Sequence, residues 1–325
     1  MKCSYCNNEA GNTIIEAKEL LLGIGGNFNY NYCGECRGLQ LLDIPSDMAK
    51  YYPQQDYYSF KSNEGYLEDV DSFKNKIRKA KAEYLLFNRQ SLIGALTSIG
   101  YKMPDYYKWL EKAGVNFDSQ ILDVGCGNGD LLFKIRKLGF RKLTGIDPFV
   151  VKDIVTKEVS IFKKTVFDLD SQYDLVMSHH SFEHMEDPQL HLIQLAKLIK
   201  GNGTLLIRTP VTNSYCWEKY GVKWAALDAP RHINIQSHKS MEILAKNAGL
   251  TITDLWHDAS SFQFWGSEEY LKGINATSAN SLWKTKTNSS FTKEELNIFK
   301  KDITKLNEEK RGGEACFIIK KGNKS

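Results

Sequence analysis

Short apolar runs alternate with amphipathic segments from residue 119 to the end of the chain. Short apolar runs bounded by turn residues are typical of buried strands, and apolar positions that recur every three or four residues are typical of helices. The predicted strands are Ile121–Val124, Leu143–Ile146, Lys164–Phe167, Leu175–Ser178, Thr204–Arg208, Leu250–Leu255 and Cys316–Lys320, and the predicted helices are Leu131–Leu138, Asp187–Leu198 and Ser240–Ala248. Strands that alternate with helices of this length indicate βαβ units, so we expect an α/β fold with a doubly wound sheet.

The chain before residue 119 has a different pattern. Residues 65–115 show helical periodicity, which Gly100 and Pro104 break into at least two helices. Residues 46–64 are rich in Tyr, Pro, Gln and Ser and read as a connection. The expected organisation is a linker and helical cap over 46–118 and a main domain over 119–325 that carries substrate-loop insertions at 211–238 and 256–312.

The composition is that of an ordinary folded protein. Of 325 residues, 42% are hydrophobic and 12% are aromatic, which excludes a mostly disordered chain. No apolar run is long enough to cross a bilayer, and the first residues contain no apolar secretory segment. We therefore expect a cytoplasmic protein without a membrane span. The net charge of +4 is too small to indicate nucleic-acid binding by itself.

Four of the seven cysteines form two CxxC pairs, Cys3-x-x-Cys6 and Cys33-x-x-Cys36. Each pair makes a tight turn that aims two thiolates at one ion, and two such turns complete a tetrahedral zinc site. Disulfides are the alternative, but an odd number of cysteines and the lack of a secretory segment weigh against them. We expect a zinc ribbon over residues 1–45. A four-thiolate ion has no open position, so its role is structural.

Three glycines, Gly125, Gly127 and Gly129, follow the strand predicted at Ile121–Val124. Alternating glycines let the backbone turn sharply and approach a ligand closely. The motif departs from the G-x-G-x-x-G of dinucleotide sites, and Asp130 stands where a helix start would meet a pyrophosphate. The Asp130 carboxylate would repel a phosphate group. It would tolerate a positively charged ligand that has no phosphate. S-adenosylmethionine, with a sulfonium and an ammonium on an adenosine, is such a ligand.

Acids and histidines follow the next predicted strands. Asp147 comes twenty residues after Gly127, an offset at which an acid accepts the ribose hydroxyls of a bound nucleoside. Asp168 ends the third predicted strand and is placed to accept from an adenine amino group. His179 and His180 follow the fourth strand. Ligands bind at this carboxyl edge in open α/β sheets, so we expect these side chains around one site.

Residues 119–208 resemble the core of a class I S-adenosylmethionine-dependent methyltransferase, because the glycine loop, the acids and the next strand occur in that family's order and spacing. The resemblance implies a Rossmann-like, seven-stranded sheet. It also implies that the acid at Asp123 supports the loop and lies near the methionine amino group, and that His179 lines the cofactor through its backbone. The cofactor-binding residues that it implies are Asp123, Gly125, Cys126, Gly127, Asp147, Pro148, Asp168, Leu169 and His179.

Three later segments resemble a subgroup found in bacterial surface-glycan and secondary-metabolite pathways, which commonly carries an N-terminal CxxC…CxxC ribbon. These segments are Thr209-Pro210, Tyr220-Gly221-x-x-Trp224 and Leu227-Asp228-Ala229-Pro230-Arg231-His232. Some zinc-bearing relatives in the subgroup are sugar C-methyltransferases. Those relatives are longer and have a further C-terminal domain.

Three histidines are candidates for acceptor activation: His180, His184 and His232. Methyl transfer to a hydroxyl is helped by a general base, and histidine is the most common one. Alternatively, His180, Glu183 and His184 share one face of a helix and hold a divalent metal. A related quinone-pathway group has Glu-x-x-Glu-His here, with His180 in place of the first Glu. A third interpretation is that Glu183 and His184 only cap a helix.

The combined interpretation is methyl transfer from S-adenosylmethionine to a hydroxyl of a small molecule, sugar or glycolipid intermediate. The alternatives are an RNA methyltransferase that holds RNA with the ribbon, a sugar C-methyltransferase, and a binding module that has lost catalysis. The basic segment 74–90 favours RNA. Ser178-His179-His180-Ser181, in place of an Asn/Asp-Pro-Pro-aromatic element, and the mild net charge weigh against a nucleic-acid partner. The sequence leaves the oligomeric state open.

Overall fold

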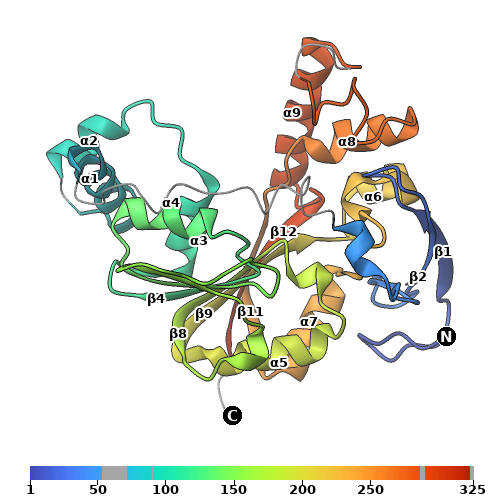
Figure 1. Cartoon of the computed structure of the whole chain (residues 1–325), viewed down its shortest axis with the longest axis horizontal. Helices are drawn as coiled ribbons and strands as arrows, with labels where there is room; N and C mark the ends of the chain where they lie inside the picture. The colour runs from blue at the N-terminus through green and yellow to red at the C-terminus, as the bar shows by residue number, and fades with distance from the viewer. Residues whose placement is uncertain (53–71, 90, 286–289, 323–325) are drawn as a thin grey trace.

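The computed structural model describes residues 1–52, 72–89, 91–285 and 290–322. Their centre is an eight-stranded sheet with the strand order β11-β12-β9-β8-β4-β5-β7-β6 (Figure 1). Strands β7, β5, β4, β8 and β9 are parallel to one another, and β12 runs antiparallel between β9 and β11. The strands are β4 (Gln120–Val124), β5 (Lys142–Ile146), β6 (Ile154–Val155), β7 (Val159–Phe162), β8 (Tyr173–His179), β9 (Ile199–Pro210), β11 (Leu250–His257) and β12 (Glu314–Lys321).

Helices cover both faces of this sheet, so the expected doubly wound architecture is confirmed. Alternation along a strand sends neighbouring side chains to opposite faces. Ile121 of β4 packs with one set of helices and Leu122 with the other, and both are fully buried. One face carries α1 (Phe73–Phe87), α3 (Asp105–Ala113) and α4 (Asp130–Leu138), and the other carries α5 (Pro188–Leu198) and α7 (His238–Asn247).

The predicted third strand, Lys164–Phe167, is wrong. The strand at this position is β7, which ends at Phe162, and Val166–Asp168 form a 3-10 helix instead. Both segments contain an apolar alternation, but Val159 and Ile161 are the residues that fill the core between β5 and α4. The eighth strand, β6, is a two-residue edge strand that pairs antiparallel with β7, and the other seven strands match the expected number.

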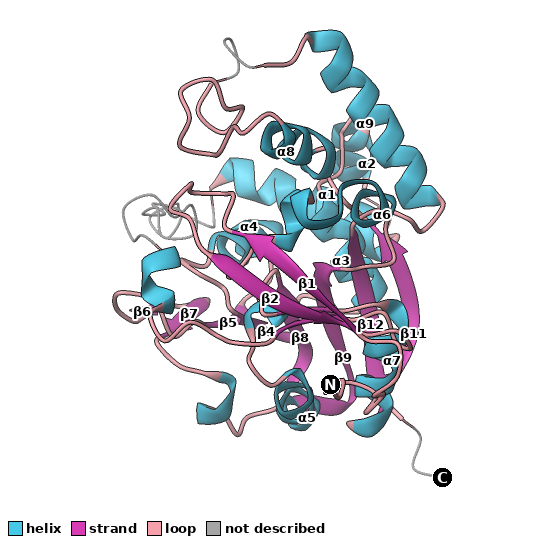
Figure 2. Ribbon diagram, turned by 90° about the vertical axis from the view of Figure 1, so that its right-hand side faces the viewer, coloured by secondary structure: helices cyan, strands magenta, loops and turns pink. Residues whose placement is uncertain are grey.

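A second sheet brings the N-terminal segment into the same body. It contains β1 (Thr13–Lys18), β2 (Asn27–Tyr32) and β3 (Leu39–Leu41), and its fourth strand is β10 (Asn234–Ile235). Gln40 and Leu39 of β3 pair with β10, so this sheet is completed by a residue pair far along the chain. Figure 2 shows β1 and β2 on the side of the molecule that faces the viewer.

The remaining helices lie at the two ends of the molecule (Figure 1). They are α2 (Leu92–Ser98), which packs on α1, and α6 (Tyr215–Tyr220), α8 (Phe262–Leu271) and α9 (Lys293–Glu308), which pack with the N-terminal sheet and one another. Among the described helices, none is long and apolar enough to cross a membrane.

Candidate functional site

The glycine loop leaves the end of β4 in a conformation that favours glycine. Gly125, Gly127 and Gly129 all have positive φ angles. A side chain on Gly125 would overlap Ser181, and one on Gly129 would overlap Ile161. The loop is therefore packed closely between β7 and the segment after β8, at the carboxyl ends of the strands, where a side chain on Gly125 or Gly129 would not fit.

Asp147, at the end of β5, supports this loop directly. Its Oδ2 accepts a hydrogen bond from the Gly127 amide at 3.0 Å, and its Oδ1 accepts from the Phe149 amide at 2.8 Å. Asp123, on β4, is buried beside it. Burial and the charge of Asp147 raise the pKa of Asp123 to about 7. Two carboxylates thus stand at the loop, which suits a ligand with hydroxyls and positive charge and disfavours phosphate.

The carboxylate of Asp168 is already used by its own turn. It accepts hydrogen bonds from the amide and hydroxyl of Thr165, at 2.8 and 2.7 Å. These bonds lower the pKa of Asp168, first through the hydroxyl and then through the amide. Its expected position at the end of a strand is wrong, because it closes the 3-10 helix after β7. Leu169 follows and packs against the core, and Pro148 is exposed beside Asp147.

The segment after β8 is tied to the glycine loop. Ser181 Oγ donates to the carbonyl of Val124 at 2.7 Å, and Ser178 Oγ lies 2.7 Å from Ser181 Oγ. The ring of His179 packs against that of Trp109, with 4.2 Å between the centroids and 32° between the ring planes. Burial and the neighbouring Arg208 hold the pKa of His179 well below its usual value, so its ring is neutral. The segment after β8 is therefore fixed against the glycine loop.

All three candidate catalytic histidines gather around one carboxylate, that of Glu183. This side chain is completely buried in a 3-10 helix over Phe182–His184. Its Oε1 lies 3.3 Å from His180 Nδ1 and 3.9 Å from His232 Nε2, and its Oε2 accepts from Thr209 Oγ1 at 3.1 Å. Burial raises the pKa of Glu183, but the hydrogen bond from His180 and the charges of His232, His180 and His184 outweigh it and hold the pKa at about 2. Glu183 is therefore an anion.

The expected helical face of His180, Glu183 and His184 is not formed. His180 precedes the short 3-10 helix and has a φ of 49°, so the three residues do not share one helical face, although His180 still reaches Glu183. The residues whose ligand atoms lie within 4.8 Å of one another are Glu183, His184 and His232. We call these three residues the Glu-His-His cluster.

Main-chain carbonyls fix the rings of the two histidines in this cluster. Nδ1 of His184 lies 2.8 Å from the carbonyl of Arg231, and Nδ1 of His232 lies 2.8 Å from the carbonyl of Ala226. A carbonyl only accepts, so both Nδ1 atoms carry a hydrogen. In the neutral form of each ring the lone pair is therefore on Nε2. Such an Nε2 can take a proton or bind a metal ion.

His180 differs from these two histidines because both of its ring nitrogens are engaged. Its Nε2 is in contact with the guanidinium of Arg208, which can only donate, and its Nδ1 therefore donates to Glu183. Arg208 is held in turn by Asp258 at 2.8 Å and by Glu314 at 2.5 Å. His180 thus connects a buried ion-pair network to Glu183 and has no nitrogen left for a substrate.

The N-terminal sheet and the segment after it hold the histidines in place. Tyr30 donates to the carbonyl of His232 at 2.9 Å, and the Tyr52 hydroxyl lies 3.1 Å from Nδ1 of His184. Arg231 is fully buried and pairs with Asp228 and with Glu19. The sequence did not predict the roles of Tyr30, Tyr52 and Glu19, because each contact joins segments more than 130 residues apart.

The four N-terminal cysteines form a compact set. Sγ of Cys3 and Cys36 are 3.6 Å apart, as are those of Cys6 and Cys33, and all four sulfurs lie within 4.8 Å of one another. Tetrahedral zinc with Zn–S bonds of about 2.3 Å needs sulfurs separated by about 3.8 Å. The Cys36 amide also donates to Cys33 Sγ at 3.4 Å, a contact that stabilises a thiolate. The geometry fits the predicted zinc site.

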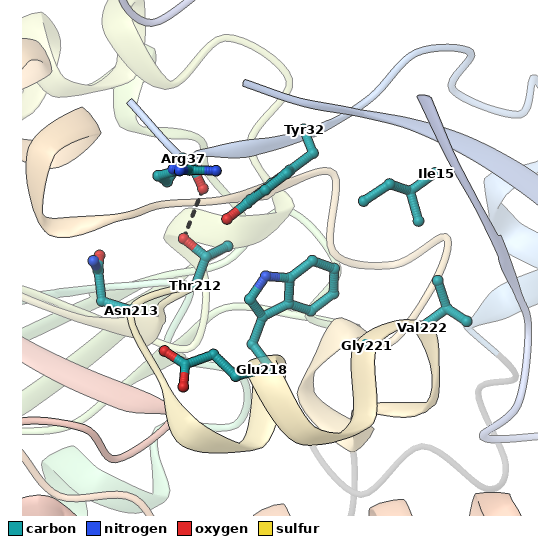
Figure 3. A pocket seen from close by; sticks show the side chains of 9 residues that line it. Ile15, Tyr32, Arg37, Thr212, Asn213, Glu218, Gly221 and Val222 are labelled. Atoms are coloured by element: carbon teal, nitrogen blue, oxygen red, sulfur yellow. Dashed lines mark hydrogen bonds between the residues drawn. The ribbon is translucent and has the colours of Figure 1, made fainter. Parts of the chain in front are cut away.

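A cavity of about 510 Å³ opens between the N-terminal sheet and α6. Figure 3 shows Arg37, Asn213 and Glu218 at one end and Ile15 and Val222 at the other. Its full lining is Ile15, Tyr32, Arg37, Thr212, Asn213, Trp217, Glu218, Gly221 and Val222. Thr212, which donates to the Arg37 carbonyl at 2.7 Å, is three residues from Thr209, the partner of Glu183.

A family model described as a methyltransferase domain matches residues 83–255, which is just over half of the chain. The chain belongs to this methyltransferase domain family. The match includes the glycine loop, Asp147 and the Glu-His-His residues up to His232.

Curated relatives of this methyltransferase domain protein match only in part. A ubiquinone biosynthesis O-methyltransferase from Rickettsia bellii is 31% identical over 152 residues, covering 42% of this chain and 62% of the relative. A tRNA U34 carboxymethyltransferase from Cellvibrio japonicus is 33% identical over 109 residues, covering 30% of this chain and 34% of the relative. The chain thus spans between a third and three fifths of their length. The tRNA relative means that the comparisons do not support the expectation against a nucleic-acid partner.

Similar solved structures include coclaurine N-methyltransferase, which is 14% identical with a TM-score of 0.41 and covers 78% of this chain and 96% of that one. The [4+2]-cyclase SpnF is 16% identical with a TM-score of 0.42 and covers 66% of this chain and 78% of that one.

Proposed function

We propose that this methyltransferase domain protein transfers the methyl group of S-adenosylmethionine to a hydroxyl of a small molecule, sugar or glycolipid intermediate. The observation that carries the proposal is the Glu-His-His cluster beside the glycine loop. Ser181 packs on Gly125, and Glu183 follows two residues later. Proton-accepting groups therefore stand where the carboxyl ends of β4 and β8 meet, next to the expected cofactor position. A hydroxyl acceptor needs such groups, because its oxygen must lose a proton when it is methylated.

The residues around the loop suit S-adenosylmethionine. Asp147 is held 3.0 Å from the Gly127 amide and would accept the ribose hydroxyls, and Asp123 would face the ammonium of the methionine part. When bound, this cofactor supplies a methyl group activated by a sulfonium. The remaining contribution of the protein is to align the acceptor, exclude water and hold the proton that the acceptor releases.

Nε2 of His232 or His184 is the atom that takes the proton. Bound S-adenosylmethionine would supply the methyl group to the acceptor oxygen and leave as S-adenosylhomocysteine, and the hydroxyl proton would move to Nε2. Glu183, which stays ionised, then stabilises the imidazolium at 3.9 Å from His232 Nε2. His180 is a positioning residue in this proposal, because its two nitrogens hold Glu183 and meet Arg208.

A divalent metal on the same cluster is the second candidate. It is favoured by the two Nδ1–carbonyl hydrogen bonds, an arrangement that metal-ligating histidines commonly have. Glu183, His184 and His232 would hold the ion, which would polarise the acceptor hydroxyl. Purified protein that is dialysed against a chelator separates the two candidates. Retained activity supports the general base. Activity that is lost while the four-cysteine zinc is still present by elemental analysis, and that returns with Mg²⁺ or Mn²⁺, ions that thiolates do not prefer, supports the metal.

We also propose that Cys3, Cys6, Cys33 and Cys36 hold a structural zinc ion. Three of these cysteines are fully buried and pack in the same core as α5 and α7. The ion would therefore stabilise the contact between the N-terminal segment and the methyltransferase domain.

The experiment that tests the activity uses methyl-labelled S-adenosylmethionine, the purified protein and a fractionated bacterial extract. Label in the nucleotide-sugar, glycolipid or small-metabolite fraction supports the proposal and provides the acceptor for identification. Label in RNA overturns it in favour of the RNA alternative. The matched control is Asp147→Ala, which removes the acid that supports the loop and should abolish labelling. If no fraction is labelled, calorimetry with S-adenosylhomocysteine distinguishes a missing acceptor from a protein that has lost its cofactor site.

A further inference from the structure

We propose that the hairpin of α1 and α2 binds the surface of a membrane that contains anionic lipids. The exposed face of α2 is apolar: Leu92 is 84% exposed, Ile93 57%, Leu96 69%, and Ile99, just past the helix end, 80%. These positions follow the spacing i, i+1, i+4, i+7 and share one side of the helix. We call these four residues the α2 apolar face. A protein that stays in water rarely exposes so many neighbouring large aliphatic side chains.

Close packing on α1 directs this face away from the protein. Gly94 is buried, and a side chain on it would meet the Ala80 carbonyl at 2.5 Å and Cβ of Tyr84 at 2.7 Å. The glycine thus lets α2 lie directly on α1 with its opposite side outward. Figure 1 places α1 and α2 at the end of the molecule opposite to β1 and β2. The hairpin can therefore meet a flat surface without hindrance from the N-terminal sheet.

The hairpin that carries the α2 apolar face is strongly basic. Residues 72–103 contain seven lysines and arginines and one acid, Glu83, so their net charge is +6, whereas the whole chain has +4. The rest of the chain is therefore slightly acidic, and the positive charge is concentrated on the hairpin. Lys74, Lys76 and Lys102 are exposed, and Lys81 lies over the ring of Tyr101, at 3.7 Å from its centroid.

This combination favours a lipid surface over other partners. Two copies related by a twofold axis would place one +6 hairpin against another, which opposes self-association. RNA would pair with the lysines but gains little from aliphatic side chains, because bases stack on aromatic ones. An anionic bilayer accommodates both groups, since the aliphatic side chains enter the interface while the lysines reach the headgroups.

The hairpin is also connected to the cofactor loop. α1 packs on α4, and α4 begins at Asp130, directly after the glycine loop. Attachment through α1 and α2 would hold the mouth of the site near the membrane, where a lipid-linked acceptor is found. The membrane proposal itself does not require the proposed methyl transfer, because vesicle binding is measured without turnover.

The test is cosedimentation of the full chain with vesicles of phosphatidylcholine, with and without phosphatidylglycerol. We expect the protein to sediment with the anionic vesicles, to remain in solution with the neutral ones, and to be released at high salt. Leu96→Asp should lower the bound fraction about tenfold, because it places a charge in the interface. Ile298→Asp on α9 is the matched control, since Ile298 is 54% exposed and the change is chemically the same. It should leave binding unchanged.

Two outcomes would overturn the proposal. If the native protein does not bind vesicles, or if Leu96→Asp binds them equally well, the hairpin is not a membrane-binding site. If the native protein self-associates in equilibrium sedimentation and Leu96→Asp abolishes this, the α2 apolar face binds a second copy of the chain instead. Cofactor binding by calorimetry, which should be equal in all variants, shows that the substituted proteins are folded. If the native protein does not bind the cofactor, that result counts against the proposed methyl transfer and leaves the vesicle result unaffected.

Discussion

Nη2 of Arg231 lies 2.9 Å from Oε1 of Glu19, and both side chains are completely excluded from solvent. This ion pair connects the end of β1 to the segment that presents His232. Asp228 accepts from the same guanidinium, so Arg231 is held from both sides. The position of a proposed catalytic histidine thus depends on a carboxylate that is more than 200 residues earlier in the chain.

Removing one member of the Arg231–Glu19 pair should destabilise the folded protein. Glu19→Ala leaves part of the Arg231 charge without its partner in the protein interior, so we expect the free energy of unfolding to fall by about 3 kcal/mol. Glu16→Ala changes an exposed acid on β1, three residues before Glu19, and should alter this free energy by less than about 0.5 kcal/mol. Urea denaturation measures both. Equal effects for the two variants would mean that the buried pair has no special role.

Substitution of His184 or His232, the histidines proposed to activate the acceptor, should slow turnover more than substitution of His180. His232→Ala and His184→Ala remove a candidate base or ligand, and kcat should fall about a hundredfold with little change in cofactor affinity. His180→Gln retains a side chain that can donate to Glu183, and we expect a smaller loss. If His180→Gln is the most damaging of the three, then His180 contacts the substrate and the assignment is wrong. Single-turnover rates with saturating cofactor provide the measurement.

The pH dependence of turnover should reflect a histidine titrating below its ordinary pKa. Burial and the charge of His184 lower the pKa of His232, and Asp228 and Glu183 only partly oppose this shift. His232 is therefore neutral and able to accept a proton at neutral pH. We expect kcat/KM to rise with pH and level off below pH 6.5. Glu183→Gln removes the buried anion, so the rise should move to lower pH. A rise that is centred well above pH 7 would contradict this assignment.

Asp123 should couple cofactor binding to pH. Its pKa is raised to about 7, from an ordinary value near 4, because it is buried next to Asp147. Without cofactor, its contribution to stability is present below about pH 4 and is lost as the pH rises toward 7. A bound ammonium favours the ionised form, so S-adenosylhomocysteine should bind more tightly as the pH rises through this range and should release protons. Calorimetry in buffers of different ionisation enthalpy detects that release, and Asp123→Asn should abolish it.

Loss of zinc should destabilise the N-terminal segment, which contains the four cysteines. Cys33→Ala should lose the bound zinc measured by elemental analysis, whereas Cys216→Ala, which changes a buried cysteine outside the cluster, should retain one ion per chain. A strong chelator should lower the stability of the native protein to that of Cys33→Ala. Equal zinc content in both variants would contradict the proposal that the four cysteines bind zinc.

The sequence predicted best where the signal is local. The short apolar run around Leu122 and the glycines after Val124 define a strand and its turn within ten residues, so this strand and the turn after it were predicted correctly. The third strand was misplaced because Val166 and Phe167 form an apolar pair as convincing as Val159 and Ile161, and only packing against β5 decides between them.

The site itself needed long-range contacts. Sequence reasoning selected His180, His184 and His232 from two separate segments, but could not bring them together around Glu183. That arrangement depends on β10 returning the chain to the end of β8, where the Ile233 amide donates to the Glu183 carbonyl at 2.9 Å. Tyr52 and Glu19 gave no signal, because one is a tyrosine in a tyrosine-rich stretch and the other a single acid after a strand.

The pairing of β3 with β10 has a consequence for how the protein is made. The first three strands of the N-terminal sheet leave the ribosome early, but their fourth strand is encoded about 190 residues later. At roughly 5–20 residues per second, the edge of β3 waits about 10–40 seconds for its partner. An unpaired strand edge is a site of aggregation. Early capture of zinc by the four cysteines would hold the nascent segment in shape during that interval, so zinc supply during translation should control how much of the protein reaches its folded state.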